Sequence, residues 1–161
     1  MDYGVIDSLS LLHVASYFGL VPLVKNPLFK RKGGPFNRKP YISVDKRDSY
    51  EESPLQKAAE RDHEAIGRML LKQGADVDAQ NSWERTTLHY AVIYGHETMM
   101  RMLLEQGANV EIKDKDGLTA LNKVATRGHE AMMRMLLKHG DRRRQGYKWN
   151  DGAGSSDHRH V

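Results

Sequence analysis

Histidine followed by glutamate occurs three times in the sequence, and the same dipeptide opens the zinc motif His-Glu-x-x-His. In that motif a second histidine one helical turn later completes the metal site. Here the corresponding position holds glycine or methionine in every copy, so no second imidazole is present. The dipeptides are His63-Glu64, His96-Glu97 and His129-Glu130, and the substituted positions are Gly67, Met100 and Met133. We therefore predict no metal site and expect the three histidines to share a structural role at the start of a helix.

Nucleophilic and phosphate chemistry lack the necessary residues as well. The chain has no cysteine, which excludes a thiol nucleophile, a thiolate zinc site and a disulfide framework. A Gly33-Gly34 pair lies in a basic segment, but Lys39 precedes Pro40 where a phosphate-binding loop requires Gly-Lys-Ser/Thr. We predict a protein that is not an enzyme and needs no cofactor.

The elements that carry these residues repeat every 33 positions. Arg-Met-Leu-Leu occurs at residues 68–71, 101–104 and 134–137. A fixed period between 20 and 50 residues is typical of stacked supersecondary units. One complete unit lies within residues 81–111, where we expect a short apolar helix, a turn at Gly95-His96 and a second helix over residues 98–105.

Thr86-Thr87-Leu88-His89-Tyr90-Ala91 resembles the Thr-Pro-Leu-His-x-Ala signature of the ankyrin repeat. The resemblance continues through Gly-Ala-Asp-Val at 74–77 and covers about residues 5–141. It implies an all-α ankyrin-repeat solenoid of stacked helix-turn-helix units with short β-hairpin or turn connections. It also implies that His13 and His89 bridge neighbouring repeats by hydrogen bonds; Gln56 and Asn122 replace the histidine in the other two units and still offer side-chain donors and acceptors.

We expect a repeat domain over residues 1–141, with units at about 5–43, 44–76, 77–109 and 110–141. The first unit holds an insertion, Lys25 to Pro40, which indicates a shortened second helix and a long basic loop. This loop is either solvated or attracts an acidic partner, phosphate or an import receptor. Glycines at 74, 107 and 140 are expected to end the second helices in a left-handed conformation. Residues 142–161 have no period and predict a disordered basic and polar tail.

Several residues depart from the repeat pattern. Gly67 removes a core side chain, so we expect its repeat to be the softest of the regular ones. Acidic residues replace turn glycines at three places, which puts the local turn geometry in question. They are Asp62, Glu51 and Glu84. Hydroxyl residues that could cap helices open the four units: Ser10, Ser53, Thr86 and Thr119.

The formal net charge is +4, but no basic stripe follows the repeat, so nucleic-acid binding is not expected. The sequence contains no run of about 18 apolar residues, so we do not expect membrane insertion. The N-terminus lacks a secretion signal, which favours an intracellular protein, cytoplasmic or nuclear. The last helix, over residues 131–137, is as apolar as an internal one. The tail could cover it, a second chain could cover it by self-association, or the sequence is a piece of a longer array. We favour the last.

In the family that the sequence resembles, partners are chosen by the concave side, formed by hairpin tips and outward positions of the first helices. Aromatic residues and arginine gather at those positions, although the repeat core does not require them there, and such side chains dominate protein interfaces. The candidate partner-binding residues are Tyr17, Phe18, Tyr50, Trp83, Arg85, Ile93, Tyr94, Lys115, Asp116 and Arg127, with Glu52 at the same face.

The sequence thus predicts a non-catalytic module that binds a protein partner on its concave face. Packing of Phe18 and Tyr94 against the adjacent unit is the alternative for those two residues. Two other functions stay open. The chain could be a structural fragment that extends a larger ankyrin array in a signalling protein, or a basic adaptor that binds an anionic partner through residues 30–39.

Overall fold

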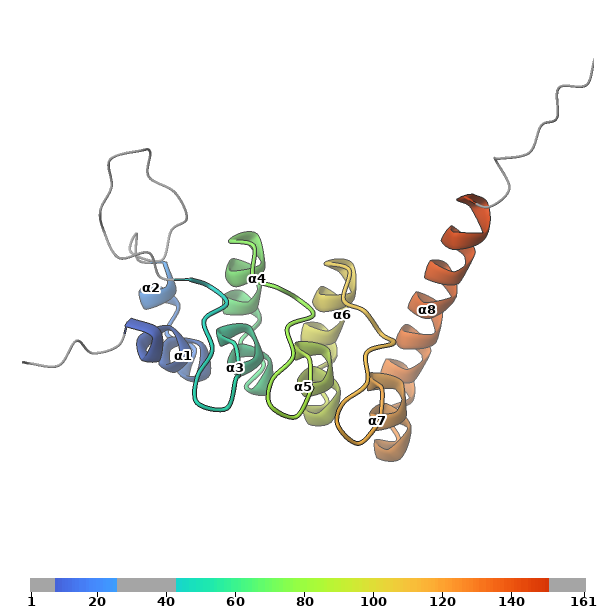
Figure 1. Cartoon of the computed structure of the whole chain (residues 1–161), viewed down its shortest axis with the longest axis horizontal. Coiled ribbons are helices and arrows are strands. Elements are labelled where there is room, and N and C mark those ends of the chain that lie inside the picture. Colours follow the sequence, from blue (N-terminus) through green and yellow to red (C-terminus); the bar gives the residue numbers. More distant parts are fainter. Residues whose placement is uncertain (1–7, 26–42, 151–161) are drawn as a thin grey trace, which may run out of the picture.

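The computed structural model describes residues 8–25 and 43–150 of the chain. The described residues form pairs of antiparallel helices, each pair lying beside the next (Figure 1). The first helices are α1 (Ser8–Phe18), α3 (Pro54–Glu60), α5 (Thr87–Tyr94) and α7 (Ala120–Arg127). The second helices are α2 (Val21–Val24), α4 (Glu64–Lys72), α6 (Glu97–Glu105) and α8 (Glu130–Asn150).

Contacts between the helices establish a solenoid. α1 contacts α3, α3 contacts α5, and α5 contacts α7, while the second helices contact one another in the same order. The loops that precede α3, α5 and α7 project side by side from the row of first helices (Figure 1). An isolated antiparallel bridge between Lys113 and Thr119 gives the last of these loops its hairpin form. The predicted all-α repeat architecture is confirmed.

The first helices begin where the capping residues predict, with one exception. Ser53 accepts a hydrogen bond from the Gln56 backbone N–H, and the Gln56 side chain accepts one from the Ser53 N–H at 2.8 Å. Thr119 forms the same reciprocal pair, and the Thr86 N–H donates to His89 Nδ1. Ser10 was predicted to start a helix, which is wrong, because Ser8 and Leu9 already have helical backbone.

The glycine expectation holds for two second helices and fails for the third. Gly74 and Gly107 have φ of 88° and 87°, as a left-handed helix end requires. Gly140 instead lies inside α8, which continues to Asn150, so the predicted disordered segment is helical over residues 142–150. The residues after each glycine explain the difference. Buried Ala75 and Ala108 draw the chain back to the core, whereas an aspartate and three arginines come after Gly140 and carry no such signal. Residues 151–161 lie outside the described residues.

Two further expectations concern α2 and α4. α2 has four residues, so the predicted shortened second helix of the first unit is confirmed, while residues 26–42 of the insertion lie outside the described residues. Gly67 in α4 leaves no gap, because a Cβ placed there would lie 2.9 Å from Met102 Cε of the next repeat. The methionines of α6 fill the space. Any lower stability of this repeat therefore comes only from the lower helix propensity of glycine.

The acidic residues at turn positions adopt the geometry of the glycines they replace. Glu51, Asp62 and Glu84 have φ of 58°, 58° and 57°, close to the 74° of Gly117. A left-handed conformation costs an L-residue about 1–2 kcal/mol. The repeat therefore keeps its turn shape at the expense of local strain.

Candidate interaction surface

The histidines of the His-Glu dipeptides reach back to the preceding repeat. His63 and His96 are the N-cap residues of α4 and α6. Their Nε2 atoms lie 2.9 Å from the Tyr17 carbonyl oxygen and 3.2 Å from the Glu60 carbonyl oxygen, respectively. The predicted structural role at a helix start is confirmed for these two. The imidazoles bond to the main chain, and no group of three potential metal ligands gathers among the described residues.

Residues of the first helices reach forward in the same way. His13 Nε2 lies 2.9 Å from the Glu52 carbonyl oxygen, and His89 Nε2 lies 3.1 Å from that of Leu118. Gln56 replaces the histidine in α3 and donates to two carbonyls near the next hairpin. Bridging between repeats by this position is therefore confirmed. Burial lowers the pKa of His89 despite its hydrogen bond to Leu118, so the ring favours its neutral form.

An aspartate or asparagine side chain fixes each hairpin tip, defined here as residues 48–52, 81–85 and 114–118. Its Oδ1 accepts hydrogen bonds from the backbone N–H groups two and four residues further along. The accepting side chains are Asp48, Asn81 and Asp114, and the bonds are 2.8–3.1 Å long. Main-chain contacts then join neighbouring tips, since the Ser82 N–H donates to the Tyr50 carbonyl at 3.2 Å and the Lys115 N–H to the Trp83 carbonyl at 3.0 Å. The tips form one connected row.

Buried charges support this row. Glu52 was expected on the partner-binding face, which is wrong, because its side chain is buried and bonds to Lys57, Tyr90 and Asn81. Lys57 also pairs with Asp48 at 3.4 Å. Burial raises the pKa of Tyr90, and its hydrogen bond to Glu52 raises it further. The carboxylate of Glu52 thus connects two repeats instead of facing solvent.

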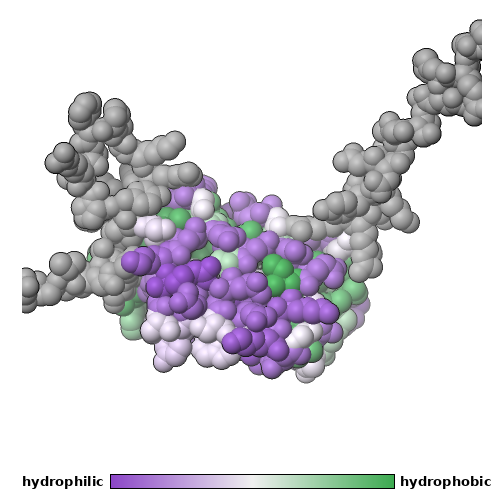
Figure 2. Space-filling model, viewed as in Figure 1, coloured by the Kyte–Doolittle hydropathy of each residue, from purple (hydrophilic) through white to green (hydrophobic). Residues whose placement is uncertain are grey.

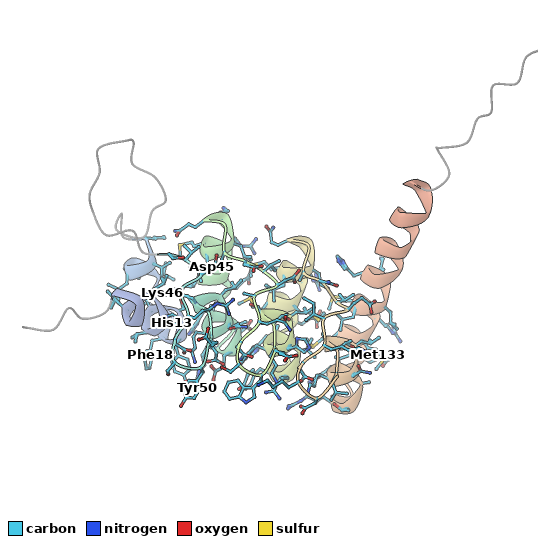
Figure 3. The ribbon with its side chains drawn as sticks, viewed as in Figure 1. His13, Phe18, Asp45, Lys46, Tyr50 and Met133 are labelled. Carbon is cyan, nitrogen blue, oxygen red and sulfur yellow. The ribbon has the colours of Figure 1, made fainter. Side chains whose placement is uncertain are left out.

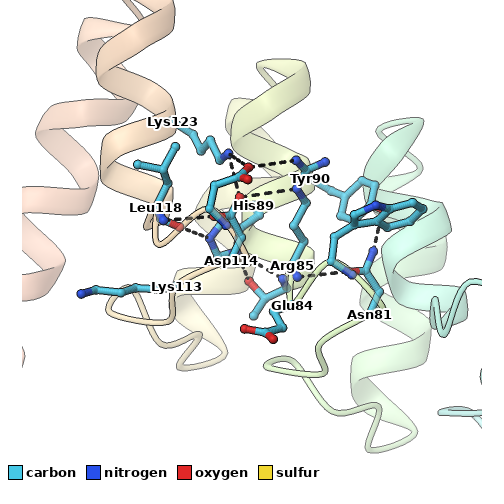
Figure 4. A network of polar contacts seen from close by, with 12 residues as sticks. Asn81, Glu84, Arg85, His89, Tyr90, Lys113, Asp114, Leu118 and Lys123 are labelled. Atoms are coloured by element: carbon cyan, nitrogen blue, oxygen red, sulfur yellow. Dashed lines mark hydrogen bonds and ion pairs between the residues drawn. The ribbon is translucent and has the colours of Figure 1, made fainter.

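A second charge network lies under the last tip (Figure 4). The Asp114 carboxylate pairs with Lys123 at 2.7 Å and with Arg85 of the preceding repeat at 3.5 Å. Burial alone would raise the pKa of Asp114, but the Lys123 hydrogen bond and the Leu118 N–H outweigh it and leave the pKa lowered. Arg85, one of the predicted partner-binding residues, therefore forms an ion pair that supports the adjacent tip.

Aromatic side chains of the first two tips lie together on the surface. The Tyr50 and Trp83 rings stack with centroids 5.9 Å apart and 17° between their planes. Tyr50 is 56% exposed and Trp83 is 43% exposed, so about half of each side chain is free for contact. Lys115 and Asp116 are exposed on the third tip, at the end of the same row. The structure thus brings four predicted residues into one surface.

The other predicted residues mark a second row at the C-terminal ends of the first helices. Phe18, Tyr94 and Arg127 are the last residues of α1, α5 and α7, and Arg61 follows α3 at the equivalent position. The Arg61 guanidinium lies 4.1 Å from the centre of the Tyr17 ring. Tyr94 is half exposed and stacks on Tyr90 and His96. Ile93 is half-buried beside it.

The surroundings of these rows are mostly hydrophilic. Figure 2 shows a face of the described residues covered largely by hydrophilic side chains, with small apolar areas. Phe18 and Tyr50 lie near one edge of the stack, whereas Met133, a residue of α8, lies at its other end (Figure 3). Sequence reasoning missed the tip glutamates Glu51 and Glu84 as surface features, although their position next to an aromatic residue in two consecutive units was a readable signal.

Stacked helix pairs, tips joined by main-chain contacts and forward-reaching histidines define a helical-repeat solenoid. A family model described as ankyrin repeats matches residues 12–114 as three copies. This match covers more than half of the chain, which therefore belongs to the ankyrin repeat family. A comparison with curated proteins gives no match. The α7 and α8 pair lies beyond the matched residues and continues the same architecture.

Proposed function

We propose that this chain is a non-catalytic module that binds a protein partner on its concave side, through the hairpin tips and the ends of the first helices. Ankyrin repeats are generally protein interaction modules. The observation that carries the proposal for this chain is the exposed Tyr50–Trp83 stack. Large aromatic side chains held on a rigid support contribute contact area at little cost in conformational entropy. No described helix is long and apolar enough to cross a membrane.

Capture of partners by the immobilised chain tests this proposal. Trp83→Ala and Tyr94→Ala each remove a ring that is about half exposed. For a partner that contacts these rings, we expect losses of about 30-fold in affinity, as a hot-spot residue gives. Leu137→Ala is the matched control, since Leu137 is equally exposed (49%) but lies on α8. Equal recovery by all three variants, with unchanged helical circular dichroism, would refute the proposed face.

A specific observation favours a second function, the extension of a repeat array. Leu11, Val14 and Leu20 are 38–40% exposed on the first repeat. The equivalents of Leu20 in later repeats are His63 and His96, which bond to the preceding repeat. We propose that this face packs against another helical repeat, which a second copy of the chain could provide.

Light scattering over a range of concentrations distinguishes this second function. We expect an average mass that rises with concentration, and we expect Val14→Asp to abolish the rise while Trp83→Ala leaves it unchanged. The mass of a single chain at every concentration would contradict self-association. Binding of an anionic partner through residues 30–39 concerns a segment outside the described residues, and the structure adds nothing to it.

A further inference from the structure

We propose that the row of hairpin tips selects a positively charged partner segment. An arginine or lysine side chain of the partner stacks on the outer faces of Tyr50 and Trp83, and Glu51 and Glu84 supply the opposite charge. This inference rests on the proposed protein-binding function and adds the chemistry of the partner to it.

The aromatic pair has the geometry that a cation requires. The two rings stack on each other, and exposed fractions of 56% and 43% leave about half of each residue accessible to a partner. The face of a tyrosine or tryptophan ring attracts a guanidinium or ammonium group through its quadrupole. The chain contains the same contact internally, since Arg61 lies over the ring of Tyr17 at 4.1 Å.

The charges at the tips favour a cation over an anion. Glu51 and Glu84 are exposed, each directly follows one of the two rings, and within residues 8–25 and 43–150 neither carboxylate forms an ion pair. Several cations close to the tips are held by hydrogen bonds or ion pairs. Arg47 donates to the carbonyl oxygens of Glu51 and Gln80, at 2.8 and 2.6 Å.

Unlike Arg47, which meets uncharged carbonyl groups, Lys57 pairs with the buried carboxylate of Glu52, while Arg85 and Lys123 share that of Asp114. The three tips contain six carboxylates and two cations, Arg85 and Lys115, and adding the supporting Arg47, Lys57 and Lys123 leaves a net charge of −1, although the whole chain carries +4. A phosphate backbone would be repelled at this row.

Backbone strain supports a role for the two glutamates beyond folding. Both occupy left-handed conformations, at φ of 58° and 57°, where the third tip has Gly117. A glycine would relieve this strain, and neither glutamate side chain gives the fold an ion pair in return. Strained residues of this kind concentrate at functional sites. Folding of the repeat therefore does not explain why glutamate, and not glycine, occupies these two strained positions.

The second row has the opposite polarity and provides an internal control. At the ends of the first helices, Arg61 and Arg127 alternate with Phe18 and Tyr94. The two arginines disfavour a cationic segment there, although Asp62 follows Arg61 directly, so we expect such a segment to follow the tips. Removing a charge from one row should therefore change affinity in the opposite sense from removing a charge from the other.

Fluorescence of Trp83 tests the inference directly. The chain has two tryptophans, so a Trp149→Phe background makes Trp83 the only one. The probes are three synthetic peptides of equal length, (Arg-Gly)4, its neutral citrulline analogue and (Glu-Gly)4. We expect saturable quenching by the arginine peptide alone, weakening as salt rises.

Charge variants in the same background locate the contact. Glu51→Gln combined with Glu84→Gln should raise the Kd for the arginine peptide about fivefold at low salt, the effect of two exposed charges. Tyr50→Ala should raise it about threefold. Two matched controls keep the fold and change charge elsewhere: Glu105→Gln on α6 should have no effect, and Arg127→Gln should leave the Kd unchanged or lower it.

Several results would overturn the inference. They are equal affinity for the citrulline peptide, tighter binding of the glutamate peptide, no quenching at about 1 mM arginine peptide, or no effect of the double glutamine variant. The last result leaves the proposed function intact if Trp83→Ala still abolishes capture of a protein partner, so the two proposals fail separately. Circular dichroism of each variant confirms that the helices are retained.

Discussion

Replacing Glu84 by glycine should stabilise the fold, although it removes a side chain. Glu84 has φ of 57°, a conformation that costs an L-residue about 1–2 kcal/mol. Glycine avoids this cost but loses more backbone entropy on folding, about 0.5–1 kcal/mol. The two hydrogen bonds of Glu84, from its N–H to Asn81 and from Gln80 to its carbonyl, use only its main chain and are retained. The net expectation is a gain of about 0.5–1 kcal/mol.

Urea and thermal unfolding followed by circular dichroism measure this gain. For a chain of this size, we expect a Tm increase of about 1–4 °C. Gly117→Ala is the matched reverse substitution. Gly117 has φ of 74°, and a Cβ there would meet no atom within 4 Å, so any loss of stability comes from the backbone alone. We expect a loss of about 1 kcal/mol.

A decrease in stability for Glu84→Gly, or no change for Gly117→Ala, would show that left-handed strain does not control these tips. The same Glu84→Gly variant should bind the arginine peptide more weakly. Opposite signs in stability and affinity would identify the glutamate as a residue retained for recognition, whereas a parallel change would contradict that role.

Two predictions concern acid sensitivity and use substitutions that another repeat already contains. The pKa of His89 is lowered by burial, so the unfolded state takes up the proton first as pH falls below about 6.5, and stability declines. His89→Gln, which copies Gln56, should keep its stability at about pH 7.5 and lose this part of the decline in urea titrations at several pH values. The pKa of Asp114 is also lowered, so its stabilisation is present above about pH 4 and is lost as pH falls through the folded pKa. Asp114→Asn, which copies Asn81, should keep the tip but leave Lys123 with only the exposed carboxylate of Asp116 at 3.6 Å, costing about 2 kcal/mol near neutral pH and little once the pH is below the folded pKa of Asp114.

Features that depend on residues close in sequence could be predicted from the sequence. The capping partners of Ser53 and Thr119 lie three positions away, and the left-handed glycines at 74 and 107 follow directly from the end of an apolar helix. The 33-residue period then places equivalent residues in equivalent surroundings. The bridging roles of His13 and His89 were implied by the resemblance to the ankyrin repeat, and the structure bears them out.

Features that depend on contacts between unlike repeats could not be predicted in this way. Glu52 is buried because Tyr90, 38 residues further along, stands where the second and fourth units have lysine. The space at Gly67 is filled by Met102 from the next repeat. Gly140 has the sequence context of a helix end on its N-terminal side only. In each case the outcome depends on a neighbour that equivalent positions in other repeats do not share.

The buried network also determines the spacing of the exposed rings. Asp48 accepts a hydrogen bond from the Tyr50 N–H and forms an ion pair with Lys57. Asn81 accepts a hydrogen bond from the Trp83 N–H and donates one to Glu52 at 3.3 Å. Because Lys57 and Glu52 bond to each other, an unbroken chain of polar contacts joins the anchor of one tip to the anchor of the next. Loss of the Glu52 carboxylate should therefore disturb the Tyr50–Trp83 stack without altering either ring. The distance between the exposed rings is thus set by buried and half-buried residues beneath them.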